Sequence, residues 1–165
     1  MLEKLASTSV PAPRLMAYEA STGTMVQSLM PGRQVIEVLR EHDDCHDILS
    51  QIGSAIRRLH HIGAVHGDLT TNNLLWDEEP GVSMIDFGLS LVTTEVEKMG
   101  LDLQVLSECL TASHPEHSGA MEIVLEGYLS TTSEDEYEGS DTPPPKAEQV
   151  MHRFEEIRSR VRYHG

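Results

Sequence analysis

Apolar residues recur at three- and four-residue steps between Cys45 and Ile62, which is the most regular pattern in the chain. The apolar positions are Ile48, Ile52, Ala55, Ile56 and Leu59. This spacing is typical of the buried face of an amphipathic helix. Asp43 or Asp44 could cap the start of the helix, and Gly63 could end it in a left-handed conformation. The pattern predicts a core-facing helix.

Shorter apolar runs predict hairpins before and after this helix. The first pair of strands is expected at 14–18 and 24–29, and the second at 73–76 and 82–86. Polar and Gly-containing turns separate the strands within each pair, as in β-hairpins. Further helices are predicted at 101–110 and 121–129. A last helix is predicted from Val150, because apolar residues there recur at steps of four, three and four.

Length and composition allow one modest domain with a tail. The chain has 165 residues, of which 39% are apolar and 4% aromatic, so a core must be built from aliphatic side chains. A net charge of −15 argues against binding nucleic acid or an anionic membrane over the whole surface. No apolar run reaches the roughly 18–20 residues that span a bilayer, so we expect no membrane partner. Cys45 and Cys109 are interpreted as reduced core thiols.

The centre of the chain combines the residue types that phosphoryl transfer requires. Asp68 is expected on a loop after the long helix, Asn73 lies at the start of the second hairpin, and Asp86 lies at its far end. The two strands could therefore bring Asn73 and Asp86 to one edge. Such a site needs a carboxylate to orient the attacking oxygen and oxygen ligands to hold Mg²⁺ against the phosphates. Gly88 would let the chain turn sharply beside Asp86.

Two motifs in this region carry a resemblance to known proteins. HGDLTTNN at 66–73 and IDFG at 85–88 resemble the catalytic loop and the Asp-Phe-Gly segment of protein kinases. HGDLTTNNLL followed by IDFGLS is similar to the small atypical kinase/ATPase of the KEOPS (EKC) complex, the PRPK family. As in that family, only 13 residues separate Gly88 from Asp102, and no Ala-Pro-Glu motif follows. The Arg-rich end of the chain is also similar to that family's basic tail.

The resemblance implies a fold and an active site. The expected fold class is α+β: a protein-kinase-like, mostly helical C-lobe with a catalytic-loop β-hairpin and a stub of the N-lobe sheet. Asp68 would be the catalytic carboxylate, and Asn73 and Asp86 would be the Mg²⁺ ligands. The adenine-binding hinge, with its register left open, would be formed by Gln27, Ser28, Leu29 and Met30.

Other residues of the motifs would support this site rather than react. His66, Gly88 and Asp102 are expected to be structural, with Asp102 bracing the catalytic loop from a helix. Gly67 stands where regulated kinases carry Arg, so a phosphorylated activation loop would find no Arg there to pair with.

The resemblance also divides the chain into four segments. Residues 1–32 would be a remnant of the N-lobe and hinge, 33–129 the C-lobe, 130–149 an acidic, Pro-rich disordered linker, and 150–165 a basic C-terminal helix and tail. The tail arginines are Arg153, Arg158, Arg160 and Arg162. They could contact tRNA phosphates or a partner, or they could form the solvated face of an amphipathic helix.

The implied activity is that of an ATP- and Mg²⁺-dependent serine/threonine protein kinase or ATPase of the cytoplasm and nucleus. It would support threonylcarbamoyladenosine modification of tRNA, with the KEOPS transferase subunit and other KEOPS subunits as partners. The tRNA would be contacted indirectly or through the basic tail.

Two parts of a kinase active site are missing from the sequence. Before Gly53 the only glycines are Gly23 and Gly32, so no Gly-rich loop is present, and Lys4 lacks the context of the phosphate-binding lysine. The chain therefore resembles an N-terminally truncated family member, for which we expect weak or no phosphoryl transfer. One alternative is a non-catalytic, pseudokinase-like scaffold. Another is a small-molecule phosphotransferase of the aminoglycoside or choline kinase type, although those enzymes usually carry His where this chain has Thr70.

Overall fold

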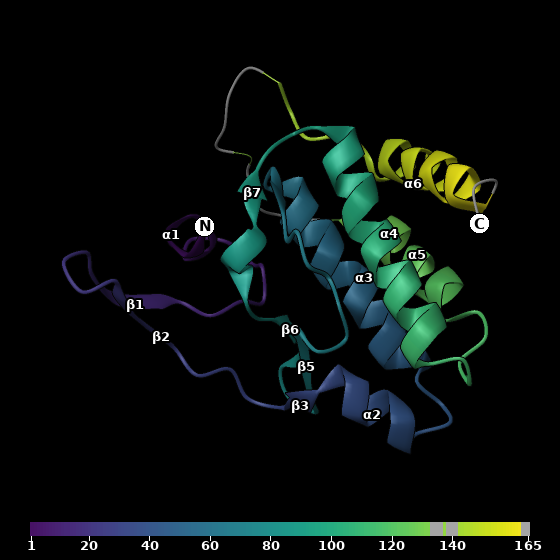
Figure 1. The fold of residues 1–165 in the computed structure, drawn as a ribbon, viewed down its shortest axis with the longest axis horizontal. Coiled ribbons are helices and arrows are strands. Elements are labelled where there is room, and N and C mark those ends of the chain that lie inside the picture. The colour runs from purple at the N-terminus through teal and green to yellow at the C-terminus, as the bar shows by residue number, and fades with distance from the viewer. Residues whose placement is uncertain (133–136, 138–141, 163–165) are drawn as a thin grey trace.

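The computed structural model describes residues 1–132, 137 and 142–162, and it places helices around a small set of short antiparallel strands (Figure 1). The helices are α1 (Leu2–Leu5), α2 (Val35–Glu41), α3 (His46–His61), α4 (Val96–Ser113), α5 (Ala120–Ser130) and α6 (Ala147–Arg162). The strands are β1 (Leu15–Glu19), β2 (Thr24–Gln27), β3 (Arg33–Gln34), β4 (Ala64–Val65), β5 (Leu74–Asp77), β6 (Gly81–Met84) and β7 (Leu91–Val92). The architecture is the α+β one expected from the sequence.

Helix α3 forms the centre of the fold and packs closely against α5. Its predicted apolar stripe is buried, with Ile52, Ile56 and Leu59 fully inaccessible. Gly53 and Gly127 allow the two backbones to touch, because a Cβ atom on Gly53 would lie 1.9 Å from the carbonyl oxygen of Val124. A Cβ atom on Gly127 would likewise lie 2.1 Å from a backbone oxygen of α3. The α3–α5 crossing therefore depends on glycine from both sides.

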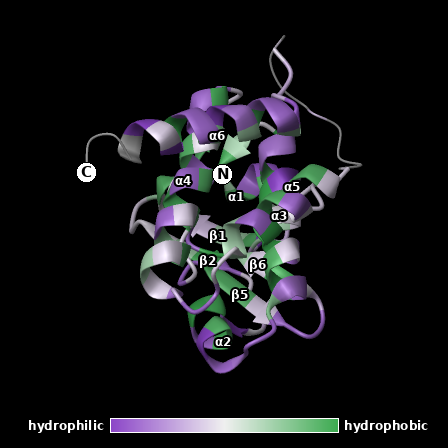
Figure 2. Cartoon of the chain, turned by 90° about the vertical axis from the view of Figure 1, so that its right-hand side faces the viewer, coloured by the Kyte–Doolittle hydropathy of each residue, from purple (hydrophilic) through white to green (hydrophobic). Residues whose placement is uncertain are grey.

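Helices α4 and α6 complete the helical body. Gly100 of α4 lies against α6, where an added Cβ would be 3.0 Å from the Ile157 side chain and 3.3 Å from the Phe154 nitrogen. Val150 and Phe154 of α6 are fully buried and belong to the same hydrophobic cluster as α3. Figure 2 shows α6 crossing the end of the body above α4. No helix among the described residues is long and apolar enough to cross a membrane.

The strands form three small sheets rather than one. Strand β5 lies between β3 and β6, β4 pairs with β7, and β1 pairs only with β2. The β5–β6 hairpin packs on α3, whereas the β1–β2 hairpin projects away from the helical body (Figure 1). The β5–β6 hairpin carries two of the predicted site residues at its open end.

Most predicted elements are present, with shifted ends. The long helix begins at His46, and its N-cap residue is Cys45, which makes no side-chain cap bond. Of the two predicted capping residues, Asp44 accepts from the first helical nitrogen, that of His46, at 3.3 Å. Gly63 follows the helix in the predicted left-handed conformation, with φ of 69°. The last helix begins at Ala147, three residues before the predicted start, so the predicted linker ends earlier than expected.

Other features were missed or cannot be compared. Helix α2 was not predicted, although its buried residues Val35, Val38 and Leu39 have helical spacing. Much of the predicted disordered linker, at 133–136 and 138–141, lies outside the described residues. Both cysteines are free, as expected, but Cys109 is half-buried rather than a core residue.

Candidate active site

The open end of the β5–β6 hairpin brings Asn73 and Asp86 to one edge, as the sequence predicts. In the hairpin, Leu74 is paired with Met84, and the Ile85 nitrogen donates to the Asn73 carbonyl oxygen at 2.9 Å. Asp86 is therefore the residue next to this backbone contact. It has a left-handed conformation, with φ of 61°, and its Oδ1 accepts from the Gly88 nitrogen at 3.3 Å.

Asn73 is joined directly to Asp68. Its Nδ2 donates to the Asp68 carbonyl oxygen and to Asp68 Oδ2, each at 2.9 Å. Both side chains are half-buried, whereas Asp86 is exposed. Because the amide nitrogen is used in this way, Asn73 Oδ1 is the atom left to accept a cation. The two bonds hold the Asp68 carboxylate toward the hairpin.

His66 links the loop to the strand that leads to Asp86. Its Nε2 lies 2.9 Å from the Ile85 carbonyl oxygen, and its Nδ1 accepts from the Asp68 nitrogen at 3.4 Å. The ring is fully buried and packs against Phe87, with centroids 4.8 Å apart. The His66 imidazole thus connects the Asp68 backbone to Ile85, the neighbour of Asp86, and its supporting role stays a prediction.

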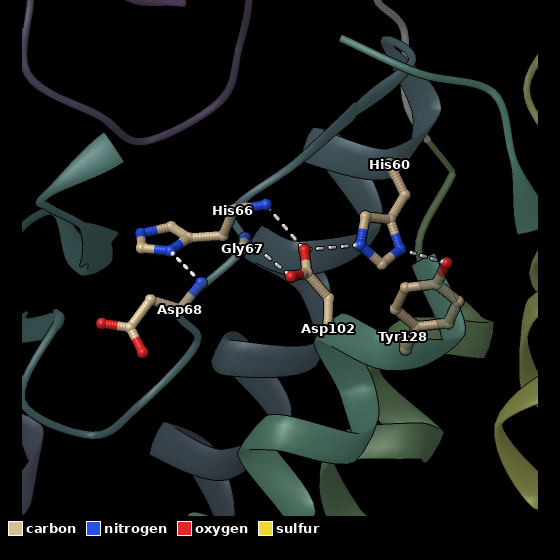
Figure 3. Close-up of polar contacts among 6 residues, drawn as sticks. All are labelled: His60, His66, Gly67, Asp68, Asp102 and Tyr128. Atoms are coloured by element: carbon tan, nitrogen blue, oxygen red, sulfur yellow. Dashed lines mark hydrogen bonds and ion pairs between the residues drawn. The ribbon is translucent and has the colours of Figure 1, made fainter. Parts of the chain in front are cut away.

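Asp102 of α4 holds the loop from below (Figure 3). Its Oδ2 accepts from the His66 nitrogen at 2.7 Å, and its Oδ1 accepts from the Gly67 nitrogen at 2.8 Å. The carboxylate is only 2% exposed. Charge-assisted bonds of this kind are among the stronger hydrogen bonds in proteins. Asp102 thus holds the backbone amides of the two residues that precede Asp68, His66 and Gly67.

Gly67 is required by the backbone at this point. Its φ is 84°, and a Cβ atom would lie 2.3 Å from the Leu89 carbonyl oxygen. A side chain such as Arg could enter only if the segment after Asp86 moved away. Gly67 stands where regulated kinases carry Arg. Because it has no side chain, the loop at Gly67 and the segment at Leu89 approach each other closely.

Sequence reasoning missed one anchor of the loop, the buried Thr71. Its Oγ1 lies 3.1 Å from His114 Nε2 and 3.5 Å from Cys109 Sγ, and its carbonyl oxygen accepts from the Ile36 nitrogen at 3.0 Å. Burial lowers the pKa of the His114 imidazole. No local signal could have revealed these partners, because they come from distant parts of the chain.

A pocket of about 440 Å³ lies beside Asp86, between the β1–β2 hairpin and α1. Gln27 lines this pocket together with Phe87 and Gly88. The other hinge candidates are placed differently. Ser28 is bonded to Arg14 through both its nitrogen and its hydroxyl group, at 2.9 Å each, and Leu29 is 94% exposed. Of the four predicted hinge residues, Gln27 is the one that the structure brings to the pocket.

The ionisable side chains that line this pocket are acidic. Glu3 and Asp86 line it, and within the described part of the chain it has neither a lysine nor an arginine in its wall. Lys4 is directed elsewhere, with its Nζ 5.8 Å from the centroid of the Tyr137 ring. Lys4 therefore does not line this pocket.

The residues nevertheless fit a magnesium ion bound together with phosphates. Mg²⁺ prefers oxygen ligands and is usually held by one or two carboxylates, with substrate and water oxygens completing its shell. Asp86 and Asn73 Oδ1 would supply protein ligands of this kind. Among the described residues no group of three or more His, Cys, Asp and Glu side chains is placed to hold a metal ion by itself.

The arginines of the C-terminal tail are partly used within the fold. Arg153 pairs with Glu97 of α4 and with Glu156, and Arg158 lies 3.8 Å from Glu122. The pKa of Glu97 is lowered, chiefly by its hydrogen bond to Arg153. These contacts favour a structural role for Arg153, which holds α6 onto α4.

The fold and the site together define a lobe of the protein kinase class. The sequence profile described as Protein kinase domain matches residues 1–116. The solved structure of monomeric WbdD is similar to this chain, with a TM-score of 0.54 over 76% of this chain and 34% of that chain. At 18% sequence identity this likeness shows the fold alone.

Curated relatives narrow the class. The EKC/KEOPS complex subunit BUD32 of Yarrowia lipolytica is 30% identical over 98% of this chain and 70% of its own length. The probable serine/threonine-protein kinase BUD32 homolog of Archaeoglobus fulgidus is 31% identical over 93% of this chain and 68% of its own. A probable bifunctional tRNA threonylcarbamoyladenosine biosynthesis protein of Methanothermobacter thermautotrophicus is 32% identical, and this chain spans only 27% of its length. The chain therefore belongs to the Bud32 family of the protein kinase class.

Proposed function

We propose that this chain acts as a Bud32-type subunit of a KEOPS complex in the nucleus and cytoplasm. In this proposal it binds ATP with Mg²⁺, transfers the phosphoryl group to Ser or Thr or to water, and supports threonylcarbamoyladenosine modification of tRNA beside the transferase subunit. The names of the relatives support the assembly and the tRNA pathway, and one relative is named as a probable serine/threonine kinase. The chain spans about two thirds of the Bud32 relatives, so these whole-protein properties are part of the proposal.

The observation that supports the enzymatic part is the contact between Asp68 and Asn73 at the open end of one hairpin. Asn73 Nδ2 donates to Asp68 Oδ2, and Asp86 follows the residue whose nitrogen donates to the Asn73 carbonyl oxygen. The fold thus brings the backbone at Asp86 next to Asn73, although the two residues are 13 positions apart in the sequence. The arrangement matches the division of roles in phosphoryl transfer, in which one carboxylate orients the nucleophile and separate oxygens hold the metal.

Each residue would have a distinct task. The Asp68 carboxylate would accept a hydrogen bond from the attacking hydroxyl group or water and orient it toward the phosphate. Asn73 would keep that carboxylate in place through Nδ2 and offer Oδ1 to the metal. Asp86 would be the charged metal ligand. Bound Mg²⁺ would neutralise charge on the phosphate oxygens.

A titration with Mg·ATP, followed by single-turnover hydrolysis, tests this proposal. We expect Asp86→Ala to weaken Mg·ATP binding by at least about tenfold, because a charged metal ligand is lost. Glu78→Ala is the matched control, since Glu78 is an exposed carboxylate at the opposite end of the same hairpin. Binding that is equal in wild type and both variants would reject the enzymatic role of this site.

The acidic pocket favours a second candidate, a non-catalytic scaffold. Neither lysine nor arginine lies in the described pocket wall, and the carboxylates of Glu3 and Asp86 there oppose the charge of a triphosphate. In that case the lobe would bind the KEOPS transferase subunit while transferring no phosphoryl group. Co-purification with the transferase in the absence of measurable nucleotide binding would support the scaffold, and nucleotide binding without co-purification would count against it.

A further inference from the structure

A continuous chain of buried polar groups runs from α5 to the catalytic loop (Figure 3). The Tyr128 hydroxyl lies 2.8 Å from His60 Nδ1, and His60 Nε2 lies 3.3 Å from Asp102 Oδ2. Asp102 in turn accepts from the backbone nitrogens of His66 and Gly67. Tyr128 and His60 are fully buried and Asp102 is 2% exposed, so bulk water does not replace any of these partners. Three helices thus contribute one side chain each.

The chemistry of the groups sets the direction of the hydrogen bonds. The Asp102 carboxylate can only accept, so a neutral His60 ring that bonds to it must carry its proton on Nε2. The lone pair on Nδ1 is then free to accept from the Tyr128 hydroxyl. Burial raises the pKa of Tyr128, which keeps this hydroxyl group protonated and able to donate. The Tyr128 hydroxyl can therefore donate to Nδ1 of the same neutral His60 tautomer that donates to Asp102 through Nε2.

The surroundings hold the Tyr128 ring in place. Its ring meets His60 edge to face, with the centroids 5.5 Å apart and the planes at 70°. The Arg57 guanidinium lies 5.6 Å from the centroid of the same ring and donates to the Pro145 carbonyl oxygen at 3.2 Å. The hydroxyl group is thus directed at His60 by contacts on more than one side.

We propose that Tyr128 is a positioning residue for the catalytic loop. Its hydroxyl group satisfies His60 Nδ1 and so holds the ring whose Nε2 donates to Asp102, and Asp102 in turn holds the His66 and Gly67 amides. The inference rests on the proposed function, in which Asp68 orients the nucleophile. Neither motif of the sequence contains Tyr128, and its helix does not line the pocket beside Asp86.

Tyr128→Phe is the sharpest variant, because it removes one oxygen atom and keeps the ring that fills the core. Without the hydroxyl donor, the buried Nδ1 of His60 loses its hydrogen-bond partner, so the ring is held less firmly against Asp102. We expect hydrogen exchange at the His66 and Gly67 amides to accelerate by about tenfold more than at other slowly exchanging amides. Ile157→Val is the control: it removes one methylene from the α6 side of the core and touches no member of the polar chain.

The protonation of the His60 ring can be read directly from its two ¹⁵N shifts in the full chain. Wild type should show the proton on Nε2, and in Tyr128→Phe the Nδ1 shift should change because its hydrogen bond is lost, while Ile157→Val leaves the wild-type pattern. A proton on Nδ1 in wild type would overturn the proposal even if the variant failed to fold. Equal amide acceleration in Tyr128→Phe and the control would also overturn it.

Binding of Mg·ATP by the same proteins separates this inference from the proposed function. We expect Tyr128→Phe to weaken binding severalfold relative to Ile157→Val. Absence of binding by wild type would reject the proposed enzymatic function, and the tautomer and amide-exchange results would still decide whether Tyr128 positions the loop.

Discussion

The helical body and the β1–β2 hairpin contain similar apolar residues but place them in opposite environments. In α3, Ile52, Ile56 and Leu59 are completely buried, whereas in the hairpin Met16 and Tyr18 are 69% and 64% exposed. Each side of the candidate site is carried by one of these regions. Asp68 and Asn73 are anchored through Asp102 and Thr71 to the helical body, while Gln27 belongs to a hairpin of two strands.

This difference in burial separates the well-supported half of the candidate site, the loop that carries Asp68, from the exposed half, the β1–β2 hairpin. A two-stranded hairpin is marginally stable unless its apolar face is covered. The loop that carries Asp68, by contrast, is bonded to buried groups on α4 and to the hairpin β5–β6. The loop that carries Asp68 and the hairpin that carries Gln27 are thus supported to very different degrees.

The largest contrast is expected from one truncation in each region. Ile56→Ala should lower the free energy of unfolding by about 2–5 kcal/mol, since it leaves a cavity in the core. Met25→Ala, at a side chain that is 53% exposed, should change it by less than about 0.5 kcal/mol. Urea denaturation of both variants measures these values. Similar losses in the two variants would show that the hairpin is as well packed as the body.

A second prediction compares how much two helix interfaces, α3–α5 and α4–α6, contribute to stability. Gly53→Ala places a methyl group against the α5 backbone, and we expect a loss of about 1–3 kcal/mol or more. Gly100→Ala is the matched control, because its new methyl group would meet the movable end of Ile157 and would gain helix propensity of up to about 1 kcal/mol. The close α3–α5 crossing would be refuted by a Gly53→Ala protein as stable as Gly100→Ala.

A smaller, pH-dependent effect is expected at His114, which holds Thr71 of the loop. Burial lowers the native pKa of this imidazole below its ordinary value of 6.5. As the pH falls below about 6.5, the unfolded chain binds a proton before the native protein does, so this group should reduce stability until the native pKa is reached. In His114→Gln the decrease in stability over this range should be shallower. Unfolding curves at successive pH values provide the measurement, and unchanged slopes would contradict the prediction.

The smallest effect is expected at the α4–α6 contact of Arg153 and Glu97. The carboxylate is partly exposed, so salt should screen the pair and Arg153→Ala should change stability only slightly. Because the native pKa of Glu97 is lowered, the stabilisation is present above the unfolded pKa near 4.5 and is lost as the pH falls through the native value. Thermal unfolding of wild type and variant at low and high salt measures this stabilisation. The difference between their unfolding temperatures should decrease at high salt and should disappear at acidic pH.

Several parts of the fold and site were predictable because their signals are local. The stripe in α3, the β5–β6 hairpin and the grouping of Asn73 with Asp86 follow from spacing along a short stretch of chain. Asp102 was anticipated from the resemblance to a family, which supplies information that periodicity does not. Helix α2 has only two turns, and its few apolar positions give a weak signal beside the strand that precedes it.

Other parts could not be predicted, since their partners are distant in sequence. His60 has no local property that indicates its contact with Tyr128, 68 residues later. The tail arginines looked alike in sequence, yet Arg153 pairs with Glu97 on another helix. The hinge register depended on how the β1–β2 hairpin sits beside Asp86, and the structure brings Gln27 to the pocket.

The sequence alone determined the helical and hairpin elements, the three oxygen-bearing residues of the candidate site and the absence of a Gly-rich loop, because each depends on residue type and short-range spacing. Only the tertiary structure decided which groups hold those residues in place. The His66 and Gly67 amides contact Asp102, Asp102 contacts His60, and His60 contacts Tyr128, in a region where glycines let α3 and α5 approach closely. Once these polar groups are out of contact with water, each must find its hydrogen-bond partner within the fold.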